Sequence, residues 1–273
     1  MQVYGGKGAN QAVAAAWTGG KIAFVSCVGE DAYTPQMVQN YKNDGIDTRF
    51  VFGEKDVASG CALILIGQTG ENIIAVAPGA NYRLTPEKVD EAAELFDEAA
   101  IIVMQFEVEE KTVKHVLEQA NKKKVPGMWN VAPARAFDFL LIQQVNILVL
   151  NEVEAGFLVG MQVENEADAE VAAQKLVNNG VEKVIITLGS KGAFVTTKTE
   201  KVSVPAFKVE AVDTTAAGDT FCGAFAVALV EGKSLKDALQ FASAAAAISV
   251  TRIGAQPSAP TREEIDIFHK NQL

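Results

Sequence analysis

The sequence is poor in the residues on which many enzyme chemistries depend. Its 273 residues include only two histidines, His115 and His269, and three cysteines, Cys27, Cys61 and Cys222. Each histidine stands alone in a polar, helix-like stretch, which argues against a histidine-based catalytic triad or a histidine zinc site. The cysteines are odd in number and have no CxxC spacing. This pattern is typical of a reduced cytoplasmic protein and predicts three small core or near-surface residues.

The chain also lacks an excess of positive charge and long hydrophobic runs. Its 24 lysines and arginines stand against 34 aspartates and glutamates, which gives a net charge of −10. That balance argues against nucleic acid or an anionic membrane as the main partner. No apolar run reaches the roughly 18 residues that span a bilayer, and no basic segment precedes an apolar one as in a secretory signal. We therefore expect a soluble, cytoplasmic protein that holds any highly charged substrate by local donors and a metal ion.

Several common catalytic signatures are missing. Neither HExxH nor GxSxG occurs. The segment at 232–234 (GKS) resembles the end of a phosphate-binding P-loop, but the position of its first glycine is occupied by Val227. The glycines near the amino terminus do not form GxGxxG, because the position after Asn10 is Gln11. These signatures therefore give no support to a P-loop, zinc-protease or serine-hydrolase function.

What the sequence does contain is a regular alternation of short apolar runs and amphipathic segments. The apolar runs at 22–29, 99–106, 145–151 and 183–189 each stand beside a helix-like segment, which predicts βαβ units and a parallel sheet covered on both faces. Residues 84–99 are predicted to form one helix that begins with a threonine cap and a proline. At 273 residues, the chain suits one large α/β domain or two small ones.

One segment breaks this alternation. Residues 59–81 are predicted to form two strands joined by a glycine-containing turn, with no helix between them. A hairpin inside a βαβ series usually leaves the main sheet, so we expect a small β lid over about residues 58–78, with residues 1–5 at its edge. The absence of a linker-like tract favours a single domain over residues 1–273. The expected fold is a three-layer α/β/α arrangement with a mostly parallel central sheet.

The most informative motif is AVDTTAAGDTFCGAF at residues 211–225. It predicts a strand, a turn of small residues and a helix that starts near Gly218 and Asp219. The small side chains of Ala216, Ala217 and Gly218 allow their N–H groups to approach an anion at the helix N-terminus. Asp219 would repel that anion unless it accepted a proton from an incoming hydroxyl, which is the task of the base in phosphoryl transfer. The alternative is an ordinary helix cap after a tight turn.

A second motif, GGKGANQAVAAAW, lies at residues 5–17. Its glycines at 5, 6 and 8 predict a loop that lets the backbone approach a ligand closely. Lys7 and Asn10 supply a cation and an amide that can bind hydroxyl groups. The alternative is a glycine-rich turn that opens a buried, alanine-rich helix.

Two further motifs follow predicted strands. Asn151 and Glu154 lie three residues apart on one face of a first helical turn, and their oxygens suit Mg²⁺, often through water. The alternative there is an asparagine cap with a first-turn glutamate. Thr187, Gly189 and Gly192 lie at a strand end and turn, where α/β sheets bind ligands. The alternative is a simple turn into the next strand.

Together these motifs resemble the ribokinase-like (PfkB-type) family of sugar and nucleoside kinases. The resemblance extends from Gly5 to REEID near the end of the chain. It rests on the combination of GGKGANQA with DTTAAGDTF, supported by GENIIAVAPGAN, NEVEAGFLVG and AISVTRIGAQPS. It implies ATP-dependent phosphorylation of D-ribose to D-ribose 5-phosphate by in-line transfer. The alternative within the class is another sugar or a nucleoside, such as deoxyribose or fructose.

The resemblance also implies a role for each residue of the motifs. Asp219 would deprotonate the primary hydroxyl of the sugar, while the backbone N–H groups of residues 216–218 would hold the transferring phosphoryl group. The residues implied to contact ribose hydroxyls are Gly6, Lys7, Asn10 and Glu107. Those implied at the nucleotide are Asn151, Thr187, Gly189, Gly192 and Gly218. Glu154 would bind Mg²⁺ through water, and an activating K⁺ would lie among Asp213, Thr215, Ile253 and Gly254.

In this family the lid often also forms a homodimer contact, which we expect here. The sequence departs from the family pattern at its start, because members carry a first core strand, more lid and a sugar-gripping Asn/Asp pair before the glycine-rich motif. We therefore expect a gap in the sheet that removes a large fraction of a stability of about 5–15 kcal/mol. This departure favours a further alternative, an N-terminally shortened, inactive chain that binds nucleotide or a partner without catalysis.

Overall fold

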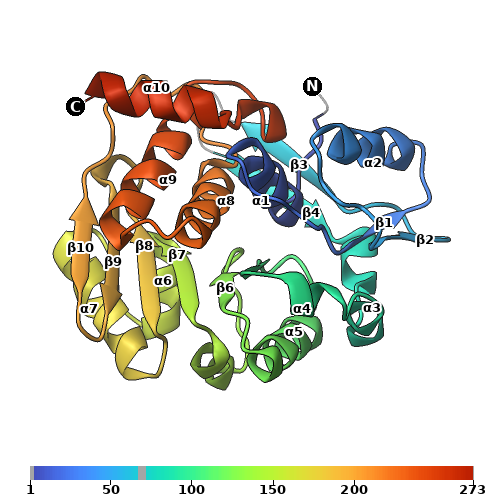
Figure 1. Ribbon diagram of the computed structural model, residues 1–273, viewed down its shortest axis with the longest axis horizontal. Helices are drawn as coiled ribbons and strands as arrows, with labels where there is room; N and C mark the ends of the chain where they lie inside the picture. The colour runs from blue at the N-terminus through green and yellow to red at the C-terminus, as the bar shows by residue number, and fades with distance from the viewer. Residues whose placement is uncertain (1–2, 67–71, 273) are drawn as a thin grey trace.

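A six-stranded sheet forms the middle of the molecule, and helices cover both of its faces (Figure 1). The computed structural model describes residues 3–66 and 72–272. Four neighbouring strands run parallel, and a hairpin of two antiparallel strands completes one edge. In spatial order the strands are β10 (Lys201–Val204), β9 (Ala193–Thr197), β8 (Lys183–Thr187), β7 (Ile147–Asn151), β6 (Gly127–Asn130) and β5 (Ile102–Met104).

The central strands are apolar on both faces because each face packs against helices. In β7, Leu148 and Leu150 belong to the hydrophobic cluster on one side, whereas Ile147 and Val149 belong to the cluster on the other. The first cluster includes side chains of α5 (Glu110–Lys123), α6 (Glu152–Val159) and α7 (Glu166–Asn178). The second includes side chains of α8 (Ala217–Val230) and α9 (Leu235–Ser249). The predicted three-layer α/β/α fold with a mostly parallel sheet is confirmed.

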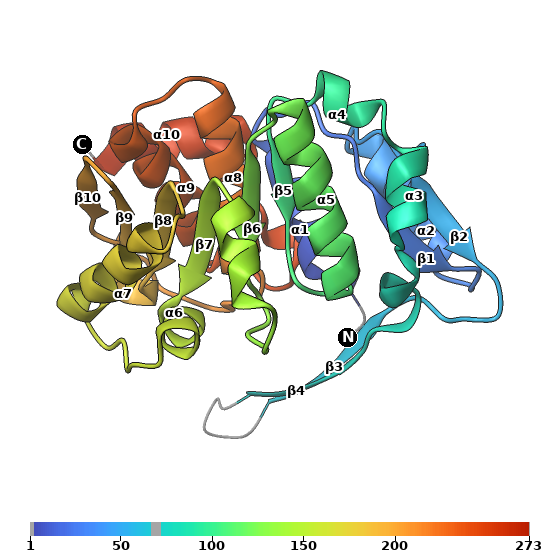
Figure 2. The same cartoon turned by 90° about the horizontal axis from the view of Figure 1, so that it is seen from below.

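Two smaller sheets stand apart from this core (Figure 2). Strand β1 (Ser26–Gly29) pairs in parallel with β2 (Val51–Glu54), and among the described strands each has no other partner. Strands β3 (Cys61–Ile66) and β4 (Asn72–Ala77) form the antiparallel hairpin predicted as a lid, which leaves the main sheet. Residues 67–71, over which the sequence predicts the turn of this hairpin, lie outside the described residues, as do residues 1 and 2, predicted at the lid edge.

The amino-terminal half contributes α1 (Lys7–Trp17), α2 (Thr34–Asn43) and the 3-10 helix η1 (Gly79–Arg83). The single helix predicted over residues 84–99 is instead two short ones, α3 (Pro86–Glu91) and α4 (Leu95–Glu98). Hydrogen bonds of the 3-10 type join them, since Leu95 N–H donates to the Ala92 carbonyl and Phe96 N–H to the Ala93 carbonyl. The backbone is tighter there than an α-helix, and no Pro or Gly signals this break.

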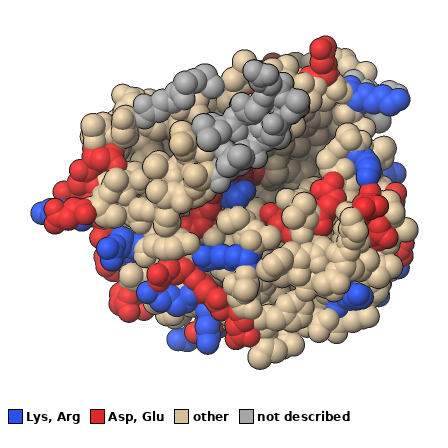
Figure 3. Space-filling view, turned by 180° about the vertical axis from the view of Figure 1, so that it is seen from behind, with Lys and Arg blue, Asp and Glu red and all other residues tan. Residues whose placement is uncertain are grey.

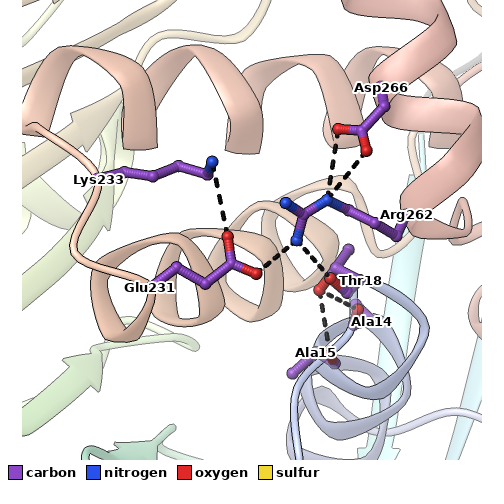
Figure 4. A network of polar contacts seen from close by, with 7 residues as sticks. All are labelled: Ala14, Ala15, Thr18, Glu231, Lys233, Arg262 and Asp266. Carbon is purple, nitrogen blue, oxygen red and sulfur yellow. Dashed lines mark hydrogen bonds and ion pairs between the residues drawn. The ribbon is translucent and has the colours of Figure 1, made fainter.

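The chain ends in α10 (Arg262–Gln272), and Arg262 ties this helix to α8 and α1 (Figure 4). Its Nη1 lies 2.5 Å from Glu231 Oε1 after α8 and donates to the Thr18 carbonyl after α1 at 3.3 Å. Its Nε donates to Asp266 at 3.3 Å. The guanidinium therefore holds the carboxyl end of α1, the helix whose other end enters the candidate site. The remaining 3-10 helices are η2 (Phe139–Gln144), η3 (Gly189–Lys191) and η4 (Gln256–Ser258).

The cysteines occupy the kinds of position that the sequence predicts. Cys27 and Cys222 are buried and Cys61 is exposed, and all three are free thiols. Within residues 3–66 and 72–272, every helix is too short or too polar to cross a membrane.

Candidate active site

The carboxyl ends of β7 and β8 meet the amino-terminal ends of α8 and α1 at a cavity of about 200 Å³. On the face shown in Figure 3, acidic and basic side chains gather around a hollow in the middle of the molecule. The carboxyl edge of a parallel sheet is the usual place for ligands in α/β proteins. The cavity is lined by Lys7, Asn130, Ala132, Val149, Leu150, Asn151, Glu154, Thr187, Thr214, Ala216, Ala217, Gly218, Asp219 and Cys222.

Asp219 lies in the first turn of α8 and is only 5% exposed. Its Oδ2 accepts a hydrogen bond from Asn10 Nδ2 at 2.9 Å, and its Oδ1 accepts one from Gln11 Nε2 at 3.1 Å. Burial raises the pKa of Asp219, while the Lys7 charge and the two amide donors oppose that rise. A buried carboxylate with a raised pKa, facing a cavity, has the properties of a general base.

The amino terminus of α8 is built from small residues, as the sequence predicts. The helix begins at Ala217, after Ala216 in the left-handed conformation with a φ of 60°. Left-handed backbone costs free energy in a residue other than glycine, and such strain is common where a site requires it. Ala217 N–H donates to the Thr214 carbonyl at 3.3 Å, a long bond. A Cβ atom built on Gly218 would meet no atom within 4 Å, so space lies open beside this helix end.

The amino terminus of α1 faces the same cavity. Gly6 precedes the helix with a φ of 94°, and Lys7 N–H donates to Glu107 Oε2 at 2.8 Å. Burial lowers the pKa of Lys7, but the charges of Asp219, Glu107 and Glu154 outweigh it and raise that pKa. Lys7 therefore carries its charge into the cavity. The helix starts one residue before Gly8, so Gly8 lies in α1 and not in the predicted loop.

Asn10 and Glu107 also carry signs of an incomplete polar site. Asn10 Oδ1 is buried and has no hydrogen-bond partner within the described part of the chain. A buried amide oxygen without a donor is costly, and a ligand hydroxyl would satisfy it. Burial raises the pKa of Glu107. The sequence-predicted sugar contacts Gly6, Lys7, Asn10 and Glu107 are thus brought together at one helix end.

Asn151 and Glu154 form the helix cap that stood as the alternative to a ligand site. Asn151 Oδ1 accepts the Glu154 N–H at 2.8 Å, and Glu154 Oε2 accepts the Asn151 N–H at 2.8 Å. Both residues nevertheless line the cavity, and burial raises the pKa of Glu154. No cluster of three or more His, Cys, Asp or Glu side chains suited to a metal occurs in the described ranges. One carboxylate fits Mg²⁺, which commonly keeps several waters and binds phosphate oxygens.

The residues predicted at the nucleotide are only partly brought to the cavity. Thr187 lines it at the end of β8, whereas Gly189 begins the short helix η3 beyond and Gly192 follows that helix. Gly192 has a second reason to be glycine, because its φ is 111° and an added Cβ would lie 2.1 Å from the Val204 carbonyl of β10. A close approach of two backbone segments therefore accounts for this glycine, and a role at the nucleotide stays a prediction.

The four residues predicted to surround K⁺ come from two loops that the structure joins. Asp213 Oδ1 accepts the Thr215 N–H and Asp213 Oδ2 accepts the Gly254 N–H, both at 2.9 Å. These bonds lower the pKa of Asp213 against the opposing effect of burial. The loops that carry Thr215 and Gly254 therefore meet at one ionised carboxylate. A K⁺ among these residues and Ile253 stays a prediction.

Sequence reasoning missed two polar residues of the site, Gln11 and Asn130. Asn130 ends β6 and lines the cavity, and Gln11 follows Asn10 in α1 and reaches Asp219. A signal was present for Asn130, since it follows a buried strand just as Asn151 does. For Gln11 the sequence offered only a polar residue within an otherwise apolar helix.

Arg135 was also missed. Its guanidinium carbon lies 3.7 Å from the centroid of the Phe106 ring, and its Nη2 donates to the Val108 carbonyl at 2.5 Å. These contacts hold the loop that carries Glu107 from both sides. Arg135 therefore supports the site without lining the cavity.

Comparison with known proteins places this arrangement among sugar kinases. A family model described as pfkB family carbohydrate kinase matches residues 1–262. The chain is 42% identical over 261 residues to a ribokinase of Haemophilus influenzae, which covers 96% of this chain and 85% of the relative. It is 39% identical over 265 residues to a deoxyribokinase of Salmonella typhi, covering 97% and 87%. A solved structure of Arabidopsis thaliana ribokinase complexed with ribose and ATP superposes with a TM-score of 0.92 at 34% identity, covering 97% and 87%.

Proposed function

Because the chain belongs to the pfkB family of carbohydrate kinases, we propose that it phosphorylates D-ribose to D-ribose 5-phosphate with ATP as the phosphoryl donor. The observation that carries the proposal is the buried carboxylate of Asp219 beside the open amino terminus of α8. A base and an anion-binding helix end in one cavity are what transfer to a hydroxyl requires.

In the proposed reaction, Asp219 accepts the proton of the primary hydroxyl as the hydroxyl oxygen attacks the γ-phosphorus of ATP. The bond between that phosphorus and the oxygen bridging to the β-phosphate breaks, and ADP leaves. The N–H groups at the start of α8 lie where negative charge grows on the transferring phosphoryl group. Lys7 adds a positive charge to the same cavity. Asn10 and Glu107 hold the sugar hydroxyls and orient the attacking oxygen.

We propose further that Glu154 holds Mg²⁺ through water, and that Asp213, Thr215, Ile253 and Gly254 hold an activating K⁺. Mg²⁺ would offset phosphate charge during transfer. Asn151, Thr187, Gly189, Gly192 and Gly218 are proposed to contact ATP. An assay in which Na⁺ or a larger organic cation replaces K⁺ tests the K⁺ site. The rate of ADP release is expected to be higher with K⁺ than with either replacement.

A homodimer through the lid is also proposed. The exposed apolar side chains Leu63 and Val76 on its two strands support it, being 62% and 54% exposed. Sedimentation of the chain and of a Leu63→Lys variant tests this contact, because a buried lysine at the interface would favour the monomer. We propose that the enzyme acts in the cytoplasm, where ATP is supplied, as one domain over residues 1–273.

The experiment that tests the function is ADP release measured with a panel of sugars at saturating ATP. Ribose is expected to give the highest kcat/KM. The second candidate is deoxyribose, which is favoured by the 39% identity to a deoxyribokinase, and a higher kcat/KM with deoxyribose would establish it instead. Absence of sugar-dependent ADP release from a folded chain would favour the alternative of an inactive nucleotide-binding protein.

A further inference from the structure

A chain of three buried polar side chains links the central sheet to the carboxylate in the cavity. Gln11, which is 4% exposed, donates from Nε2 to Asp219 Oδ1 at 3.1 Å and to Asn130 Oδ1 at 3.2 Å. Asn130, which is 7% exposed, donates from Nδ2 to the Val149 carbonyl of β7 at 3.1 Å. Helix α8, helix α1 and strands β6 and β7 are thereby joined through side chains.

The direction of the hydrogen bonds in this series of side chains is determined by the acceptor at its end, the Val149 carbonyl. The Val149 carbonyl can only accept, so Asn130 must turn its NH₂ group toward β7 and its oxygen toward α1. Gln11 must then present its NH₂ group to that oxygen, and the same group reaches Asp219. The result is a donor aimed at Asp219 Oδ1, which matches an ionised carboxylate and opposes a proton on that oxygen.

Asn10 bonds the other carboxylate oxygen but differs in one respect. Its own Oδ1 has no partner within the described residues and can accept a hydroxyl from a ligand. Neither residue is among those that line the cavity. Both contacts of the Gln11 NH₂ group are made inside the protein, which leaves that group no N–H for a ligand. Asn10 is thus suited to the substrate and Gln11 to the base alone.

Close packing of α1 on α8 keeps Gln11 at this distance. A Cβ atom built on Gly223, one turn after Asp219, would lie 2.6 Å from the Gln11 carbonyl and 2.7 Å from the Ala15 nitrogen. Only glycine allows the two backbones to approach this closely. The hydrogen bond from Gln11 to Asp219 therefore depends on the close approach of α1 and α8 that Gly223 allows.

We propose that Gln11, anchored by Asn130, is a positioning residue that holds Asp219 Oδ1 and maintains the ionised carboxylate for proton abstraction. This inference rests on the proposed function of Asp219. It assigns Gln11 no contact with sugar, nucleotide or metal. The donor acts against burial, which by itself raises the pKa of Asp219.

The test replaces Gln11 by methionine, which keeps the length of the side chain and removes the donor. For Gln11→Met we expect kcat with the preferred sugar to fall about 10- to 100-fold, the usual effect of losing a hydrogen bond to a charged group. The KM values for sugar and ATP should change less than about threefold. The acidic limb of the kcat–pH profile should move to higher pH. Gln39→Met, an exposed glutamine on α2 that donates to Asn43, is the matched control.

Two further measurements separate positioning from general damage to the fold. In an Asp219→Asn background, Gln11→Met should have little additional effect on kcat, because the ionisable carboxylate that Gln11 holds is already gone. Full additivity of the two losses would overturn the proposal. Should Gln11→Met fail to fold, Asn130→Leu breaks the same chain from the sheet side, and the same shift of the pH profile is expected.

A readout without turnover keeps this inference distinct from the proposed function. Titration of the ¹³C-labelled aspartate carboxyls by NMR, with Asp219→Asn for assignment, should show a higher pKa for Asp219 in Gln11→Met than in the unsubstituted chain. An unchanged pKa would overturn the inference even in an active kinase. A raised pKa in a chain that phosphorylates no sugar would support the positioning contact while the proposed function fails.

Discussion

The two helices that meet at the candidate site are supported very differently. Helix α8 packs on strands buried on both faces, and Phe225 in its middle is fully buried within a large cluster shared with α9. Helix α1 packs on its other side into a small cluster around Tyr41 and Ile46. The lid beyond it exposes 62% of Leu63.

Apart from its close packing on α8, helix α1 therefore depends on individual polar contacts. Glu107 holds the first turn of α1, and Arg262 holds its last turn. The carboxyl-terminal half, by contrast, provides a rigid platform for Asp219 and the anion-binding helix end. Segments with few buried contacts have low local stability and are the ones that move when ligands bind. The difference predicts that the base and the helix pair around it stay in place while the lid adjusts.

The largest effect is expected from the rigid side. Asp219→Asn keeps the shape of the side chain and removes its ability to accept a proton, so kcat should fall about 10²- to 10⁴-fold, the contribution of a general base. Steady-state ADP release measures it, with Asp97→Asn on the exposed surface of α4 as control. Near-normal turnover by a folded Asp219→Asn protein would remove Asp219 from the mechanism and with it the assignment of the rigid half to chemistry.

The contrast in packing can be tested with two equal truncations. Leu148→Ala in β7, a fully buried position, should lower the free energy of unfolding by about 2–5 kcal/mol. Leu63→Ala in the lid should change it by less than about 0.5 kcal/mol. Urea unfolding at pH 7 measures both. Equal losses would contradict the view that the two regions differ in the depth of their core.

A small and local effect is expected at the junction between β1 and the lid. Asp31 Oδ2 accepts the Ser59 N–H at 2.8 Å, and Asp31 Oδ1 accepts N–H groups of Tyr33 and Thr34. The bond from Ser59 and the others lower the pKa of Asp31 from 3.8 to about 2. Asp31→Asn removes the charge and one of the two acceptor oxygens, which should cost about 1 kcal/mol.

The pH dependence of that loss follows from the direction of the shift. A carboxylate whose pKa is lowered by folding stabilises the native state above its ordinary pKa. The difference in urea midpoint between the unsubstituted chain and Asp31→Asn should therefore reach its largest value near pH 6. It should shrink as the pH falls from about 4 toward 2. A difference that stays constant over this range would show that the contact acts through packing and not through charge.

Much of the fold was predictable because its signals are local. The alternation of apolar runs and amphipathic segments predicted strands β5, β7 and β8 and the helices beside them, and the missing helix at 59–81 predicted the lid. The strand predicted just before the turn at 214–217 was wrong, because residues 205–216 form no strand. The small residues before Asp219 predicted a start of α8 that lies within two residues of the observed start at Ala217. The break at residues 92–94 escaped prediction because no local breaker causes it. Gly8 was assigned to a loop because composition cannot separate a loop glycine from one in a tightly packed helix.

The sequence by itself determined the order of elements, the glycine and alanine content that lets α1 and α8 approach, and the residue types available for phosphoryl transfer. Only the tertiary structure decided that Gln11 meets Asn130 and Asp219, which are 119 and 208 positions away. Local preferences are set by each residue and its near neighbours, whereas a buried hydrogen bond between distant segments depends on how whole helices pack. The partners of the carboxylate are therefore a property of the packed molecule.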